Sequence, residues 1–312
     1  MWKKRYIQEI YLEEIKKWRI FRMNSVMKEV NRKLLYIGFK YFPKTFLKVT
    51  YRFRMGRRLN LRNPKSLSEK MNYLNLYDKN ILASICADKF KVREYIEEKG
   101  FGDYLVNLLK VYDDVESIDF AKLPNKFAMK CNHGCGYNII CQDKSKLDIN
   151  NSKKLLKKWM KEQYGYRGGE YHYNDIEPKI IVEEYIEGLD SDKLPIDYKV
   201  HCFNGEPIFT LCCINREKKL QLAIYDINWN KFDAITDKYN TNNEIEKPKD
   251  YDNMLKIARE LSEPFKILRV DFYELNEKAL LGELTYTPAA GRPNYFKKEF
   301  DESMGRLVKI KE

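Results

Sequence analysis

The densest group of chemically useful side chains lies in residues 268–288, LRVDFYELNEKALLGELTYTP, a pattern typical of two short strands joined by a turn. In the first strand, alternation places Asp271 on the face opposite the apolar side chains, and in the second strand Glu283 and Thr285 share a face. These three side chains could converge on one hard cation, because Mg²⁺ takes oxygen ligands, usually one or two carboxylates plus phosphate oxygens. Spacing alone favours a simpler alternative, a β-hairpin with a solvated acidic face.

A second group follows an apolar strand that ends at Lys130, where the chain continues as CNHGCGYNII. His133, Gly134 and Gly136 lie in this segment. Small residues allow backbone N–H groups to approach phosphate oxygens, and a lysine supplies a point charge. The segment matches neither the P-loop pattern nor the dinucleotide-binding fingerprint, so an ordinary hairpin turn is the alternative.

A third group comes after another apolar strand, where Glu183, Glu184, Tyr185 and Ile186 follow in succession. A hinge at this point can offer backbone groups to an adenine base. The alternative is a strand end with exposed acids. Lys199, on a strand that comes next in the chain, adds a cation beside this region.

The elements that must position these groups mix helices with antiparallel strands. Apolar periodicity and turn signals predict helices at residues 71–77, 81–98, 152–164 and 251–262, with Ser66 or Ser68 as a cap before the first of them. Strands are predicted at residues 105–112, 127–130, 180–185, 198–203, 207–214 and 220–226, before the hairpin at 268–288. This order indicates an α+β fold and not a doubly wound parallel sheet.

Composition excludes several classes of protein. With 44% hydrophobic and 14% aromatic residues in 312, the chain can bury a substantial core and is not disordered. No apolar run approaches the length of a transmembrane helix, and the N-terminus lacks the apolar core of a signal peptide. The seven cysteines form no CxxC pair, which favours reduced thiols in a cytoplasmic protein.

Positive charge is concentrated at the N-terminus. Residues 1–58 contain 17 Lys and Arg against four Glu, so they account for the whole formal net charge of +12. Aromatic residues alternate with these cations, which suits an anionic membrane surface or an acidic polymer. The alternative is a helical cap whose aromatic side chains pack on the protein body. Nucleic acid is not expected as a partner, because no known nucleic-acid motif accompanies the charge.

Taken in order, these elements resemble the ATP-grasp superfamily, and within it the TupA-like branch found with cell-surface polysaccharide synthesis. The resemblance covers roughly residues 60–305. The segments that carry it are PKSLSEKMNYL, KCNHGCG, GGEYHY, DYKVHCFNG and GELTYTPAAG, all in the family's order.

The resemblance implies an ATP-grasp fold, in which two α+β subdomains clasp ATP, preceded here by a basic helical segment. The implied divisions are residues 1–60 for the basic aromatic segment and 61–115 for a helical linking part. Residues 116–188 would form the subdomain with the glycine-rich loop, and residues 189–312 the subdomain with the metal site.

The resemblance also implies roles for individual residues. The residues implied for ATP binding are Lys89, Lys130, His133, Gly134, Gly136, Glu183, Glu184, Tyr185, Ile186 and, at the ribose, Asp190. Asp271 and Glu283 are implied as magnesium ligands together with Thr285, which departs from the asparagine that many ATP-grasp enzymes have at this position. Arg269 and Lys199 are implied as catalytic cations, and Arg292, like Lys199, as a residue that holds an acidic substrate.

The implied function is an ATP- and Mg²⁺-dependent carboxylate–amine ligase acting through an acyl-phosphate. It would join an amino acid or another amine to a uronic acid of an acidic surface polysaccharide or its precursor, in the cytoplasm or at the inner face of the membrane. One alternative is a glycosyltransferase, for which Asp190-Ser191-Asp192 supplies a DxD sequence. Another is a non-catalytic nucleotide-binding module, which the intact Lys130, Asp271 and Glu283 disfavour.

Overall fold

The computed structural model describes residues 30–78, 80–186, 196–214 and 220–310. Two sheets organise this part of the chain, and every pair of neighbouring strands in them is antiparallel. The four-stranded sheet has the order β1-β4-β2-β3: β1 (Leu108–Tyr112), β4 (Ile180–Glu184), β2 (Phe127–Cys131) and β3 (Asn138–Cys141). The six-stranded sheet has the order β10-β9-β5-β6-β7-β8: β10 (Lys278–Thr285), β9 (Ile267–Leu275), β5 (Asp197–Phe203), β6 (Glu206–Ile214), β7 (Gln221–Asp226) and β8 (Lys231–Phe232). The predicted α+β class is confirmed.

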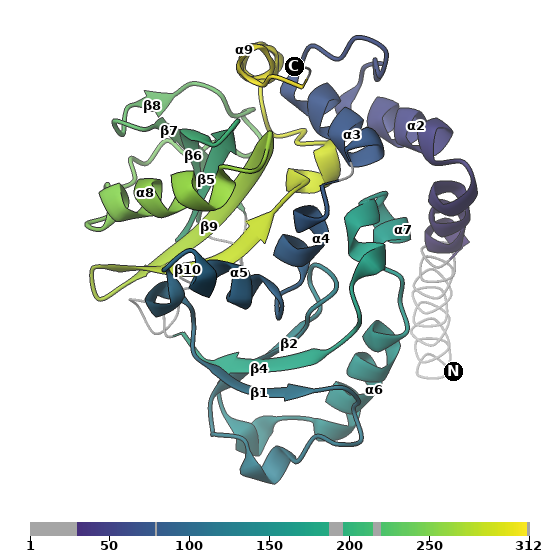
Figure 1. Ribbon diagram of the computed structural model, residues 1–312, viewed down its shortest axis with the longest axis vertical. Coiled ribbons are helices and arrows are strands. Elements are labelled where there is room, and N and C mark those ends of the chain that lie inside the picture. The colour runs from purple at the N-terminus through teal and green to yellow at the C-terminus, as the bar shows by residue number, and fades with distance from the viewer. Residues whose placement is uncertain (1–29, 79, 187–195, 215–219, 311–312) are drawn as a thin grey trace, which may run out of the picture.

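The six-stranded sheet holds the largest core. Helix α8 (Tyr251–Ser262) lies across it, as predicted for residues 251–262 (Figure 1). Its buried side chains recur three or four residues apart, so they form one stripe on β5, β6 and β9. Because this packing holds the sheet in place from one side, the strands can position side chains on the other face.

A smaller core supports the four-stranded sheet. Helix α6 (Ile149–Met160) begins at Asp148, whose carboxylate accepts a hydrogen bond from the N–H of Asn151 at 2.9 Å. The helix predicted at residues 152–164 is present, but the observed helix begins three residues earlier and ends four residues earlier than predicted. Its Leu156 is fully buried in the same cluster as Met129 and Val182 from the central strands.

The predicted helix at residues 81–98 is wrong, because the chain forms two short helices there. They are α4 (Leu82–Ala87) and α5 (Val92–Glu98), and both lie between the two sheets (Figure 1). The carboxylate of Asp88 accepts hydrogen bonds from the N–H groups of Phe90 and Lys91, at 2.8 and 3.2 Å, and from Asn132 Nδ2 at 2.9 Å. This local turn competes with the helix and holds Lys89 at the break.

The described N-terminal part is mostly helical, as predicted, with irregular chain at residues 56–66. Residues 30–41 form a helix, followed by α2 (Pro43–Met55) and α3 (Leu67–Tyr77), and Ser66 and Glu69 form a capping box on α3. The first of these helices packs closely on the next, because a Cβ at Gly38 would lie 2.0 Å from the Phe46 ring. The C-terminal helix α9 (Lys298–Leu307) packs against α3.

The predicted division of the chain stays a prediction. Strand β1, from the segment predicted at 61–115, pairs with β4 of the next segment. Among the described residues, no helix combines the length and the apolar character that crossing a membrane requires.

Candidate active site

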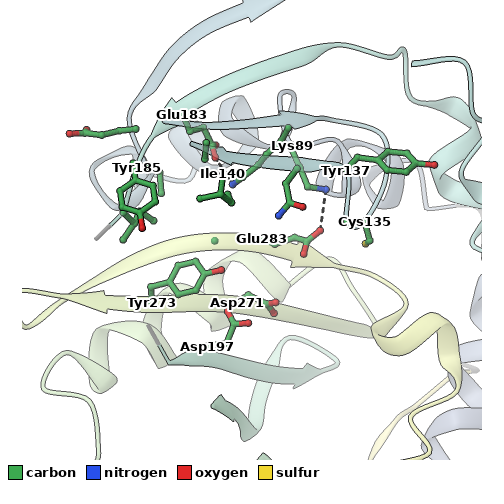
Figure 2. A pocket seen from close by; sticks show the side chains of 18 of the residues that line it. Lys89, Cys135, Tyr137, Ile140, Glu183, Tyr185, Asp197, Asp271, Tyr273 and Glu283 are labelled. Carbon is green, nitrogen blue, oxygen red and sulfur yellow. Dashed lines mark hydrogen bonds and ion pairs between the residues drawn. The ribbon is translucent and has the colours of Figure 1, made fainter. Parts of the chain in front are cut away.

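A cleft of about 310 Å³ opens between the two sheets (Figure 2). The four-stranded sheet and its loops contribute Ala128, Lys130, Cys135, Gly136, Tyr137, Asn138, Ile140, Glu183, Glu184, Tyr185 and Ile186. The six-stranded sheet contributes Asp197, Lys199, Asp271, Tyr273, Gly282 and Glu283, and Lys89 enters from the turn between α4 and α5. Most of the residues predicted to act together therefore face one space, although they are up to 194 positions apart in the chain.

The predicted metal residues lie on neighbouring strands. Asp271 on β9 is opposite Glu283 on β10, directly after a bulge in the pairing, and Thr285 is opposite Arg269. The bulge shifts the alternation of β10 just before Glu283, which lines the cleft. Thr285 does not line the cleft; its Oγ1 accepts a hydrogen bond from Arg269 Nη2 at 2.9 Å. Thr285 thus positions Arg269, and its predicted role as a metal ligand stays a prediction.

Asp271 is the centre of a buried charge network. Its Oδ1 accepts from Arg269 Nε at 2.6 Å, while Oδ2 accepts from Arg269 Nη2 at 2.7 Å and from Lys199 Nζ at 2.5 Å. Burial alone would raise the pKa of Asp271, but the charges of Arg269 and Lys199 outweigh it and hold that pKa below its usual range. Asp271 is therefore ionised at neutral pH.

The two cations of this network are equally well held. Lys199 Nζ also lies 3.0 Å from Asp197 Oδ2. Burial lowers the pKa of Lys199 and of Arg269, but the neighbouring acidic groups together, with Asp271 the strongest of them, more than compensate, so both pKa values are raised. Two cations and two carboxylates thus balance one another, and both Arg269 and Lys199 are charged at neutral pH.

Lys89 contacts two separate parts of the cleft. Its Nζ lies 3.4 Å from Glu283 Oε1 (Figure 2). It also donates a hydrogen bond to the carbonyl of Gly134 at 2.8 Å. Burial lowers the pKa of Lys89, but the nearby acidic groups, Glu283 first among them, together raise it by more, so the group stays protonated. The turn at Asp88 therefore delivers a cation to both the glycine-rich loop and the predicted metal site.

Lys130 pairs with Glu183 on the neighbouring strand, at 2.5 Å between Nζ and Oε2. Arg93 Nη1 lies 3.6 Å from the other oxygen of the same carboxylate, a partner that the sequence did not indicate. Glu184, Tyr185 and Ile186 line the cleft at the end of β4, as the predicted hinge requires. Asp190 lies outside the described residues.

One part of the glycine-rich loop lines the cleft, and another part is buried in the core. Gly136 lines the cleft with a φ of +74°, a conformation that favours glycine. Gly134 has no room for a side chain, since a Cβ would lie 2.8 Å from the rings of Tyr137 and Tyr164. His133 is buried away from the cleft, with Nε2 3.0 Å from the carbonyl of Trp159, and burial lowers its pKa. A direct role for His133 in nucleotide binding stays a prediction.

Three cleft residues were not predicted individually: Cys135 and Tyr137 in the predicted loop, and Asn138 at the start of β3. Tyr137 ties the loop to the end of α6, because its hydroxyl donates to Glu162 Oε2 at 2.6 Å. The available signal was their position in the KCNHGCG segment and directly after it.

The carboxylates fit magnesium in the way that a nucleotide site uses it. Within the described ranges no three His, Cys, Asp or Glu side chains form a metal-binding group. Mg²⁺ needs only one or two carboxylates where phosphates and water complete its shell. Glu283 Oε1 is buried and accepts no close hydrogen bond from the described residues, and Lys89 Nζ contacts it only at 3.4 Å, so a divalent cation can compete for this oxygen. Asp271 would join it only when Arg269 or Lys199 turns toward phosphate.

Arg292 lies outside the cleft lining. It donates to Thr50 Oγ1 at 2.8 Å and to the carbonyl of Gly168 at 2.5 Å, and its guanidinium lies 5.8 Å from the centre of the Phe39 ring. These contacts join α2 to the last residue of α7 (Gly165–Gly168). Its predicted contact with an acidic substrate stays a prediction.

Glu170 is a buried acid that the sequence did not single out, although it lies in the GGEYHY segment. Its Oε1 accepts a hydrogen bond from Thr287 Oγ1 at 2.7 Å. Burial, only partly offset by Thr287 and Arg292, raises its pKa to about 7. The protonated form is therefore favoured in the folded chain relative to the unfolded chain.

This shift predicts a pH-dependent stability. Between the ordinary value of 4.5 and about 7, the folded chain holds a proton that the unfolded chain has released, so the free energy of unfolding falls as pH rises. We expect Glu170→Gln to remove a fall on the order of 3 kcal/mol between pH 4.5 and pH 8. Urea denaturation of both proteins across this range measures it, with the exposed Glu260→Gln as control. Parallel pH profiles for wild type and Glu170→Gln would contradict the assignment.

The sequence places this fold and cleft in a defined class. Residues 69–309 match the family described as TupA-like ATPgrasp, which is most of the chain. The protein therefore belongs to the TupA-like ATP-grasp family and has the ATP-grasp fold. No curated protein gives a significant match.

Solved ATP-grasp structures are similar at low identity. The D-alanine–D-alanine ligase of Bacillus anthracis complexed with ATP is 15% identical, with a TM-score of 0.37 over 66% of this chain and 56% of that one. The corresponding Helicobacter pylori ligase is 12% identical, with a TM-score of 0.40 over 80% and 69%. An L-amino acid ligase from Bacillus licheniformis is 9% identical, with a TM-score of 0.43 over 85% and 56%. The chain spans only 56% of the first of these structures, and such distant likenesses concern the fold alone.

Proposed function

We propose that this protein is an ATP-dependent carboxylate–amine ligase. The observation that carries the proposal is the meeting of two kinds of charge in one cleft between two sheets. Three cations, Lys89, Lys130 and Lys199, line the cleft and pair with its carboxylates. A fourth, Arg269, contacts the carboxylate of Asp271 from behind the lining. Asp271 and Glu283 are paired across the neighbouring strands β9 and β10, and both line the same cleft. Such a site suits a polyphosphate together with a divalent cation.

In this proposal ATP lies along the cleft. Apolar side chains of Ala128, Ile140 and Ile186 line the part next to the hinge, and they would cover the faces of the adenine. The backbone at Glu184 and Tyr185 would pair with its edge. The phosphates would then extend toward Lys89 and Arg269, where the fixed positive charge is concentrated.

The proposed reaction has two steps. A carboxylate oxygen of the substrate attacks the γ-phosphorus of ATP, the bond to the bridging oxygen of ADP breaks, and an acyl-phosphate forms. An amine then attacks the acyl carbon, the carbon–oxygen bond to phosphate breaks, and the amine loses a proton as the amide forms. Arg269 and Lys199 would offset the charge that repels the incoming carboxylate. Mg²⁺, held by Asp271 and Glu283, would supply further neutralisation of the phosphate oxygens.

The finer part of the proposal concerns the substrates. We infer that the carboxylate belongs to a uronic acid of a cell-surface polysaccharide or its precursor, and that an amino acid or another amine is the donor. This inference rests on the resemblance to the TupA-like branch. It places the reaction in the cytoplasm, where nucleotide-dependent steps of glycan synthesis have access to ATP.

A trapping assay tests the proposal. The protein is incubated with Mg-ATP, glucuronate and hydroxylamine, and ADP, phosphate and hydroxamate are measured. We expect equal amounts of all three, because hydroxylamine captures an acyl-phosphate as the hydroxamate. Glucose is the matched control, since it lacks only the carboxylate, and a panel of other uronic acids and of amines follows.

Two results would contradict the ligase. Consumption of a sugar nucleotide without ATP turnover would favour the glycosyltransferase. Binding of ATP without turnover, across all uronic acids and amines of the panel, would favour a non-catalytic module.

A further inference from the structure

The two helices at the N-terminal edge of the described chain expose apolar side chains on their outer faces. Residues 30–41 and α2 lie at the edge of the molecule away from the six-stranded sheet (Figure 1). The exposed fractions on the first helix are 50% for Val30, 56% for Leu34, 49% for Ile37 and 64% for Tyr41. At the start of α2 and along it they are 60% for Phe42, 43% for Val49 and 87% for Phe53.

The spacing of these residues makes two continuous stripes. Steps of four, three and four residues on the first helix, and of seven and four on the second, return to the same side of a helix. We call these two rows together the outer stripe. Both helices already bury a different side in the protein body, through Phe39, Leu47 and Tyr51. A helix that only caps the body would present polar side chains outward, so the outer stripe marks a contact surface.

The charge around the outer stripe indicates what it contacts. Residues 30–58 contain nine Lys and Arg and no Asp or Glu. Lys33 and Lys40 are exposed beside the stripe on the first helix, and Lys48 and Arg52 are exposed beside it on α2. Basic side chains flanking an apolar stripe are the pattern of a helix that lies in the interface of an anionic membrane.

Two other occupants fit less well. A second copy of this chain would bring an equally basic surface against this one, and like charges at close range repel. A soluble acidic polymer would match the charge but would leave the large apolar side chains exposed to water.

We propose that the outer stripe, with its flanking cations, binds the protein peripherally to an anionic lipid surface. Tyr41, Phe42 and Phe53 would enter the boundary between headgroups and acyl chains, while Lys33, Lys40, Lys48 and Arg52 contact the phosphates. The inference does not depend on the proposed ligase activity, and binding can be measured without any substrate.

Vesicle sedimentation tests it with the full-length chain. The probes are vesicles of phosphatidylcholine alone and vesicles with 30% phosphatidylglycerol in phosphatidylcholine, at low and at high salt. We expect binding to the anionic vesicles that falls steeply with salt and little binding to the neutral ones. The full-length chain is needed because residues 1–29 are also basic and aromatic in sequence.

Substitutions distinguish vesicle binding through the outer stripe from binding by general charge attraction. Phe53→Ser and Leu34→Ser remove exposed apolar side chains without changing charge, and we expect each to weaken vesicle binding about tenfold. Lys48→Gln removes one cation, for an expected weakening of about fivefold. Ile227→Ser is the matched control, because Ile227 is similarly exposed at 42% but lies after β7, outside this surface.

Several outcomes would overturn the proposal. One is equal binding to neutral and anionic vesicles, and another is anionic binding that Phe53→Ser and Leu34→Ser leave unchanged, as expected of a polyanion-binding surface. A concentration-dependent dimer that these same variants dissociate would assign the stripe to a second copy. Thermal unfolding of each variant shows whether a loss of binding reflects a loss of fold.

Discussion

Glu283→Gln is expected to lower ATP-dependent turnover by about 100-fold or more while leaving the fold intact. The substitution keeps the shape of the side chain but removes one of the two carboxylates proposed to hold the metal, which line the cleft from neighbouring strands. The charge available to a divalent cation falls, and with it the neutralisation of the phosphates during transfer.

The effect on stability should be moderate, for a reason visible in the structure. Glu283 lies 3.4 Å from Lys89, whose side chain is only 19% exposed, and its charge is the largest of those that compensate the burial of that lysine. Removing the partner of a partly buried charge costs more than breaking a surface pair, on the order of 1–3 kcal/mol, although Lys89 keeps its hydrogen bond to Gly134. A rate measurement across magnesium concentrations and a urea denaturation curve therefore separate catalytic loss from unfolding.

Glu263→Gln provides the matched control. It neutralises a carboxylate that lies 3.7 Å from Lys99, in a pair of similar length at the surface. Full activity of Glu263→Gln is expected. Full activity of Glu283→Gln would falsify the metal assignment.

Arg269→Met is expected to have two large effects at once. Arg269 donates three hydrogen bonds, two to Asp271 and one to Thr285, and only 11% of its side chain is exposed. Removing one partner of a buried charge network costs about 3–5 kcal/mol of unfolding free energy, because the carboxylate loses its main compensation. Turnover should fall by about 100- to 1000-fold at saturating ATP, because a fixed charge near the phosphoryl group is lost.

A double-mutant cycle distinguishes the network from independent contacts. If Asp271 and Arg269 stabilise each other, Asp271→Asn in combination with Arg269→Met should cost less than the sum of the single changes. Denaturation of the four proteins gives the coupling free energy. Additive costs would show that the pair does not act as a unit.

Arg269→Lys then tests geometry against charge. A lysine keeps the positive charge but cannot reproduce the two parallel hydrogen bonds of the guanidinium. We expect both stability and turnover to lie between those of wild type and Arg269→Met. Turnover equal to wild type would mean that charge alone is sufficient at this position.

The fold was predictable where one local pattern decided the outcome. Helix α8 and strands β5, β6 and β7 follow from apolar residues at helical or strand spacing, since each buries one continuous face. The same alternation placed Asp271 and Tyr273 on the cleft side of β9. Lys89 was predicted only from the resemblance to the family, because no local pattern identified it.

Residues 81–98 show where local pattern failed. The apolar spacing there continues through Asp88, so a single helix was expected. The break is made by the local turn at Asp88, and a hydrogen bond from Asn132, 44 positions away in the chain, holds that carboxylate in place. Periodicity within one segment contains no information about such a partner.

The sequence by itself determined which residues could do chemistry in this protein: acids on a terminal hairpin, lysines at strand and helix ends, and small residues in one loop. Only the tertiary structure decided how they pair. Strand order in the two sheets sets Lys199 against Asp271 and Lys130 against Glu183, and the bulge in β10 precedes the position where Glu283 faces the cleft. The tertiary structure also placed His133 and Arg292 in structural contacts away from the cleft lining. The physical reason is that charge pairing acts over a few ångströms in space, whereas sequence pattern reports only neighbours along the chain.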